Sequence, residues 1–246
     1  MIKETLLAFS LAAIGQLPWK GKEHSGIAYD SEGWFHTVPD SGNKAEIYSG
    51  QATYRMEVPN RDWEALDIFK CLNVPSDDCF YIADTGMNVT GKRTPIVYEV
   101  SMKDPTRWYM HKIPYIDYNA DTEAFAINHG KMFSMKKDGK RKLYVNERGK
   151  FRLCGTIDSS GVYVTDMDMI DDLLIITYHR GRDYFIKEYR LHGCKVLESK
   201  ELNWTTTKQL EAIAYKNRNV ITAVTEDGTS YQFIRSKKNE GYQKVH

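Results

Sequence analysis

The chain has 246 residues, with 34 Lys and Arg, 33 Asp and Glu, and a formal net charge of +1. This balance excludes a broad basic surface for nucleic acid, and an aromatic share of 12% suits half-buried strands better than a disordered chain. The apolar run at residues 5–15 is too short to span a bilayer. We therefore expect a folded protein with no strong nucleic-acid signal and no membrane span.

The same apolar run bears on location. The segment Met1–Glu4 before it carries no net side-chain charge, and no small-x-small cleavage site follows it. We expect a cytoplasmic protein, with secretion or periplasmic export as the alternative if residues 1–15 act as a signal. The competing expectation is that residues 4–11 form the outermost strand of the last repeat and close a ring.

A short pattern recurs five times along the chain: an acidic residue opens a strand that continues with apolar residues. The steps between the acidic residues are 41, 59, 45 and 43 residues. A period of about 40 to 50 residues built from short strands is typical of propeller blades. The sequence predicts an all-β fold, a five-bladed β-propeller, as a single domain over residues 1–246. The five acidic residues are Glu23, Glu64, Glu123, Asp168 and Glu211.

Turn signals separate the strands within each repeat. Asp40-Ser41-Gly42 ends a strand of the first repeat, and Asp138-Gly139 marks a hairpin in the third. Residues 173–178 form an unbroken apolar and β-branched run, as expected for a strand packed on both faces. No segment shows sustained helical periodicity. The expected blades are about 20–60, 61–117, 118–159, 160–206 and 207–236, with the N-terminal strand 4–11 added to the last.

Closure of the ring would bring the five repeated acids together at one mouth of a central channel. So many like charges in a narrow space require protonation or a cation. Calcium binds six to eight oxygen ligands in a tolerant geometry, and no His/Cys cluster indicates zinc. The alternative is that each carboxylate accepts hydrogen bonds from the neighbouring blade as a structural latch. The expected ligands of calcium, or of another hard divalent metal, are Glu23, Glu64, Glu123, Asp168 and Glu211.

A second set of polar residues follows the second strand of each blade, on the same face and farther from the axis. Lys136 and Arg180 occupy equivalent positions, and beside a metal they suit a ligand that carries phosphate or carboxylate oxygens. Salt bridges to the acidic ring are the alternative role for both. In a catalytic site, Asp84 or Glu226 would be the general base. The expected substrate-binding residues are Lys136, Arg180, His179, Asp40 and Asn88.

The four cysteines, Cys71, Cys79, Cys154 and Cys194, show no metal-ligand spacing. Cys71 and Cys79 flank a turn and could pair in an exported protein, whereas a reducing cytosol would keep them as thiols. We expect thiols.

The order of the motifs resembles a bacterial propeller family of unassigned activity, whose members carry E-x-S-G-I-A, D-S-G, D-W-E-D, D-I-G-D-N, T-D-x-D and E-A-I-A. The resemblance covers about residues 23 to 235 and implies the propeller fold. This chain departs from the family at Ala65 and Met87, where the family has Asp. The matching segments are Glu23–Ala28, Asp40–Gly42, Asp62–Ala65, Ala83–Asn88, Thr165–Asp168, Glu211–Ala214 and Thr225-Glu226.

The inner strands are also similar to those of the calcium-activated nucleotidases (apyrases), five-bladed propellers whose E-x-S, A-E-W, E-S-A and E-G-I motifs surround a calcium ion. Four of the five repeats match in order, while Asp166-Met167-Asp168 stands where apyrases carry serines. This similarity implies nucleotide or other phosphate chemistry. Glycosidases of the arabinanase type also place carboxylates and a metal in such a channel, but Lys136 and Arg180 suit a neutral sugar less well.

The leading hypothesis is a metal-centred propeller that binds a small anionic substrate at the top of the channel and could hydrolyse a phosphoanhydride or phosphoester bond. The first alternative is a non-catalytic module that holds a ligand or a protein partner on the same face. Further alternatives are an interaction scaffold that uses the blade edges and a glycosidase-like propeller.

Overall fold

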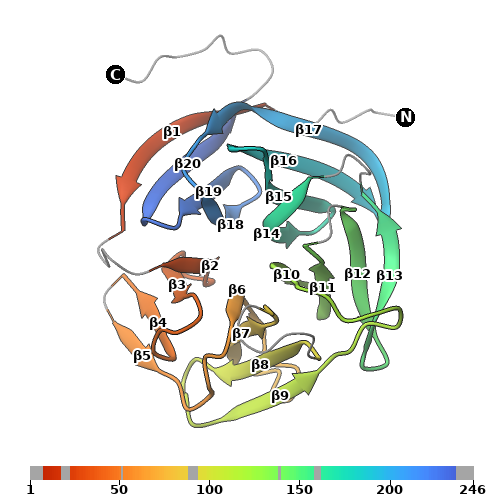
Figure 1. Ribbon diagram of the computed structural model, residues 1–246. Helices are drawn as coiled ribbons and strands as arrows, with labels where there is room; N and C mark the ends of the chain where they lie inside the picture. Colours follow the sequence, from red (N-terminus) through yellow and green to blue (C-terminus); the bar gives the residue numbers. More distant parts are fainter. Residues whose placement is uncertain are drawn as a thin grey trace.

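The computed structural model describes residues 8–17, 23–50, 52–87, 94–137, 140–157 and 162–236. Within these ranges the strands form five antiparallel four-stranded sheets arranged in a ring, and no helix occurs (Figure 1). The predicted five-bladed β-propeller is therefore confirmed. These ranges also contain no helix long and apolar enough to cross a membrane.

Each blade runs from an inner strand beside the central channel to an outer strand at the rim (Figure 1). The first blade comprises β2 (His24–Tyr29), β3 (Phe35–Pro39), β4 (Glu46–Ser49) and β5 (Thr53–Arg55). The second comprises β6 (Trp63–Lys70), β7 (Asp78–Asp84), β8 (Ile96–Ser101) and β9 (Trp108–Lys112). The third comprises β10 (Ala124–Asn128), β11 (Lys131–Met135), β12 (Lys142–Glu147) and β13 (Lys150–Thr156). The fourth comprises β14 (Tyr163–Ile170), β15 (Leu173–Arg180), β16 (Asp183–His192) and β17 (Lys195–Thr206).

The fifth blade joins the two ends of the described chain. It comprises β18 (Leu210–Asn217), β19 (Val220–Thr225), β20 (Thr229–Ser236) and β1 (Ala8–Gln16), which pairs antiparallel with β20. The predicted closing strand thus exists at Ala8–Gln16, while residues 4–7 lie outside the described residues. Pairing the ends of the ring in one sheet leaves no open seam between the first and last blades.

The core lies between neighbouring blades. Trp63, fully buried at the start of β6, belongs to one cluster with Val38 of the first blade and with Phe80 and Tyr98 of the second. The inner strands are further joined by hydrogen bonds, such as the one from Ser25 Oγ to the Trp63 carbonyl at 2.6 Å. These contacts fix the positions of the inner strands around the channel.

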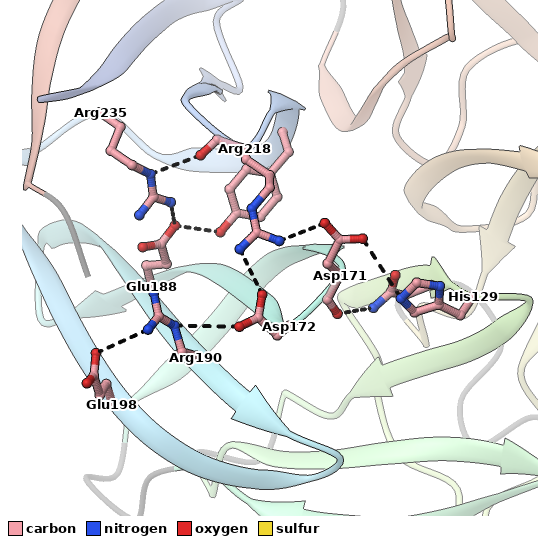
Figure 2. Close-up of polar contacts among 10 residues, drawn as sticks. His129, Asp171, Asp172, Glu188, Arg190, Glu198, Arg218 and Arg235 are labelled. Atoms are coloured by element: carbon pink, nitrogen blue, oxygen red, sulfur yellow. Dashed lines mark hydrogen bonds and ion pairs between the residues drawn. The ribbon is translucent and has the colours of Figure 1, made fainter. Parts of the chain in front are cut away.

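Ion pairs connect the fourth and fifth blades (Figure 2). Arg218, between β18 and β19, donates to Asp171 at 2.6 Å and to Asp172 at 2.9 Å, and both acids lie between β14 and β15. Arg235 of β20 pairs with the buried Glu188 of β16. The network bridges the two blades at their shared boundary.

All four cysteines form disulfides, so the expectation of free thiols was wrong. Cys71 pairs with Cys79 in the second blade, and Cys154 of β13 pairs with Cys194, which lies between β16 and β17. The second bridge joins the outer parts of the third and fourth blades. Residues 40 apart in sequence therefore meet because two blades are neighbours.

Candidate functional site

A small, highly acidic cavity of about 110 Å³ lies at the mouth of the channel where the inner strands begin. Four of the five repeated acids line it, together with two acids from the turns that follow β3 and β19. The lining residues are Glu23, His24, Ser25, Asp40, Glu64, Glu123, Lys137, Gln209, Glu211 and Glu226.

A recurrent β-bulge falls at two of the cavity glutamates. In β6, Trp63 pairs with Asp84 and Ala65 pairs with Ala83, so that Glu64 is the extra, unpaired residue. The same irregularity places Glu211 in β18. Bulges of this kind re-aim a side chain and are common near functional sites.

The bulge also shows which residue of the fourth blade is equivalent to these glutamates. Val164 pairs with Tyr178 and Asp166 with Thr177, so Thr165 is the bulged residue and Asp168 lies three residues farther along β14. Asp168 accordingly borders a different cavity, of about 360 Å³, at the end of the channel where the inner strands finish. The structure does not bring it together with the other four acids.

Asp168 has the contacts expected of a latch. Its Oδ2 accepts a hydrogen bond from the Tyr215 amide of the next blade at 2.6 Å, and its Oδ1 accepts from the Met169 amide. Asp67 makes the equivalent contact to the Ile127 amide at 2.6 Å. Burial raises the pKa of Asp168 to about 7, against the opposing effect of the two amides. For Asp168 the geometry fits the structural alternative stated above.

Burial shifts the proton equilibria of the cavity acids. Burial, followed by the nearby charge of Glu123, raises the pKa of Glu64 well above its usual range. Burial raises the pKa of Glu123 to about 7, although Lys137 acts in the opposite direction. Burial likewise raises the pKa of Glu211 to about 8. The cavity thus favours protons or a cation over free carboxylates.

Two groups of three acids lie close enough to share a cation. The carboxylate oxygens of Asp40, Asp62 and Glu64, called here the first triad, lie within 4.8 Å of one another. The same holds for Glu64, Asp121 and Glu123, the second triad. Asp62 and Asp121 were not expected as ligands, yet the sequence carried a signal, since both stand two positions before a cavity glutamate. Side chains two apart in an extended strand share a face.

The segment that follows β7 packs directly behind the triads. Asp84 Oδ1 accepts a hydrogen bond from the Asp62 amide at 3.1 Å, and Asp84 is fully buried without lining the cavity. Gly86 has no side chain, and a Cβ there would overlap the carboxylates of Glu64 and Asp62. Of the two expected general bases, only Glu226 borders the cavity among the described residues. Asn88 lies outside the described residues.

Lys136 is turned away from the cavity. Its side chain is 1% exposed and pairs with Asp117 at 2.7 Å, and its Nζ lies over the rings of Tyr115, Tyr118 and Tyr144 at 3.7 to 4.6 Å. The next residue, Lys137, reaches the acids instead.

Lys137 Nζ lies 2.7 Å from Glu123 Oε1. β11 ends at Met135, and consecutive side chains near a strand end point to opposite sides. Lys137 is thus a cavity residue that the sequence-based prediction missed by one position.

His179 and Arg180 lie at the end of β15 and do not line the acidic cavity as the described residues define it. The His179 ring stacks on Tyr163 at 5.3 Å, and Arg180 lies 5.4 Å from the Phe185 ring. Of the predicted substrate-binding residues that the structure describes, it therefore brings only Asp40 to the acids.

Comparisons with known proteins give the fold and no family. No protein-family model matches the chain, and no curated protein matches it. Neither the bacterial family nor the apyrases thus gains sequence support.

Solved β-propeller structures are similar over nearly the whole chain. A catalytically inactive variant of virginiamycin B lyase from Staphylococcus aureus, with quinupristin, is 8% identical with a TM-score of 0.52, covering 92% of this chain and 99% of the other. A putative oxidoreductase (glucose dehydrogenase) from Thermus thermophilus is 9% identical with a TM-score of 0.53, covering 92% and 100%. The PQQ-bound aldose sugar dehydrogenase of Streptomyces coelicolor is 8% identical with a TM-score of 0.50, covering 92% and 99%. At these identities the similarity shows a shared fold.

Proposed function

We propose that the acidic mouth of the channel binds a divalent cation, calcium in the first place, and through it a small ligand carrying phosphate or carboxylate oxygens. One observation carries this proposal. Glu64 is 5% exposed and lines the cavity, and its Oε1 has no hydrogen-bond partner among the described residues. Burying a carboxylate without a partner is costly, and a cation between the acids removes that cost.

The donor set favours calcium. Every ligand atom of the two triads is a carboxylate oxygen, the donor that hard cations prefer. Calcium–oxygen distances are about 2.3–2.6 Å, so oxygens on opposite sides of one ion lie about 5 Å apart. The 4.8 Å limit of each triad is compatible with that spacing. Because the acids come from bulges and turns of several blades, the geometry also suits a tolerant ion.

The oxyanion would occupy open coordination positions of the cation, beside Lys137. Within the described residues this lysine is the one Lys or Arg side chain that lines the cavity, together with His24. Liquid water occupies about 30 Å³ per molecule, so about 110 Å³ holds an ion with a few oxygens. The body of the ligand would therefore extend outward from the mouth, with only its charged group inside.

The proposal extends to hydrolysis of the bound ligand, with Glu226 as the general base. Glu226 borders the cavity, and burial followed by the charge of Glu23 raises its pKa. A carboxylate with a raised pKa beside the cation is suited to accept a proton from an attacking water. Phosphate release from a panel of phosphoanhydrides and phosphoesters, with calcium present, tests this step. A non-catalytic binding module predicts no turnover, while inorganic phosphate still raises the melting temperature.

Calcium titration by calorimetry tests the binding proposal. We compare the wild-type protein with Glu64→Gln and with the control Glu147→Gln, which changes an exposed residue at the end of β12. Loss of the buried carboxylate should weaken calcium binding by about tenfold or more, and the control should bind normally. Equal binding heats for Glu64→Gln and the wild type would show that calcium does not bind at the Glu64 carboxylate.

A further inference from the structure

We propose that the mouth holds two adjacent divalent cations, with the Glu64 carboxylate shared between them. One position is the first triad (Asp40, Asp62 and Glu64), and the other is the second triad (Glu64, Asp121 and Glu123). This inference rests on the proposed function, because it specifies how many cations the same mouth takes. It makes the ligand one that bridges two cations, such as a phosphate group.

The two triads draw on the blades before and after the one that carries Glu64. Asp40 follows β3 of the first blade, while Asp121 and Glu123 precede β10 of the third. Glu64 belongs to the second blade, between them, and it is the member common to both groups. In proteins, paired metal ions that share ligands lie about 3.5–4 Å apart, and a carboxylate with two oxygens commonly spans them.

The segment after β7 positions both triads together. Gly86 leaves room for the Glu64 and Asp62 carboxylates of the first triad. The next amide, that of Met87, donates to Asp121 Oδ1 of the second triad at 2.9 Å. One short piece of backbone therefore holds the two groups in a fixed relation, before any cation binds.

Glu64 provides the observation that points to a ligand. The side chain is 5% exposed, and its Oε1 has no hydrogen-bond partner in the part of the chain that the structure describes. A buried carboxylate used only for structure would accept hydrogen bonds from backbone amides, as Asp67 and Asp168 do. Within the described residues Glu64 Oε1 accepts no such bond, which suits a carboxylate oxygen that binds a cation.

Lys137 makes the two positions unequal. Its Nζ lies 2.7 Å from Glu123 Oε1, so a cation in the second triad competes with an ammonium group for that carboxylate. No basic side chain is paired with the carboxylates of Asp40 or Glu64 among the described ion pairs. The second triad should therefore bind a cation more weakly than it would without this lysine.

Manganese is the probe, because it replaces hard divalent cations and is paramagnetic. Calorimetry on the full chain should give two Mn²⁺ per protein with different affinities, and electron paramagnetic resonance should show a coupled pair at saturation. Asp121→Asn keeps an acceptor for the Met87 amide while removing the charge, so it should lose only the weaker event and the coupling. Lys137→Met should tighten the weaker event by about tenfold.

The outcomes separate this inference from the proposed function. One Mn²⁺ per chain in both the wild type and Lys137→Met would overturn the paired site and leave a single-cation function standing. Two uncoupled ions, or two ions retained by Asp121→Asn, would also overturn it. No binding in any variant would overturn both proposals. Glu147→Gln serves as the control, with two ions expected.

Discussion

Replacing two neighbouring lysines one at a time separates a structural charge from a functional one. Lys136 is buried against Asp117 and three tyrosine rings, and its Nζ also donates to the Tyr118 carbonyl at 2.7 Å. Removing one member of a buried ion pair typically costs about 3–5 kcal/mol. Because the Asp117 side chain is 39% exposed, water can solvate it after the change. We expect Lys136→Met to lose about 3 kcal/mol, at the lower end of that range.

Such a loss corresponds to roughly 10 °C in melting temperature for a chain of this size. Lys137→Met should lose little stability and should instead weaken ligand binding. Its side chain is 36% exposed, and its removal should cost about 1 kcal/mol while weakening the binding of inorganic phosphate in the presence of calcium.

Urea unfolding and calorimetry on the two variants give the comparison. The reasoning is refuted if Lys136→Met keeps full stability and loses phosphate binding, because that lysine would then face the ligand. It is also refuted if Lys137→Met binds phosphate as the wild type does.

Three further predictions concern the site and its support. Gly86→Ala should weaken calcium binding by about tenfold, because its Cβ overlaps the first triad, whereas Gly50→Ala, which meets nothing within 4 Å, should not; equal affinities would contradict this. Removing the Cys154–Cys194 disulfide by a double serine substitution should lower the free energy of unfolding by about 4 kcal/mol, measured in urea with and without reductant. The last prediction follows from the pKa of Glu123, which burial raises to about 7. Between its ordinary value of 4.5 and about 7 the folded state holds more protons, so metal-free stability should fall as pH rises through this window, while calcium affinity rises. A pH-independent affinity would contradict it.

The repeat alone predicted the ring. Alternating strands at a period near 45 residues cannot bury their faces singly, so the blades must stack, and acids at the starts of inner strands must meet at one mouth. This reasoning correctly brought Glu64, Glu123 and Glu211 together, with Glu23 beside them. Periodicity sufficed for Glu64 and Glu211 because each is the bulged residue of its inner strand.

What the sequence left undecided depends on single-residue geometry. Asp168 lies three residues beyond the bulged Thr165 of β14, so it reaches the far end of the channel instead of the acidic mouth. Likewise, the end of β11 decides which of two adjacent lysines meets the acids. A displacement of one residue reverses the face of a side chain but barely changes a repeat pattern.

The sequence did not predict the contacts between blades either. The pairing of Cys154 with Cys194 follows from the meeting of two outer edges, and no spacing rule predicts it. The residues near the start of the chain that complete the fifth blade were predictable as a strand, but their bounds, Ala8–Gln16, come from the register with β20. The sequence by itself determined the number of blades and the acidity of their hub, because both are properties of the repeat. Only the tertiary structure decided which side chains share that hub, because bulges, strand ends and neighbouring blades set the direction of each one.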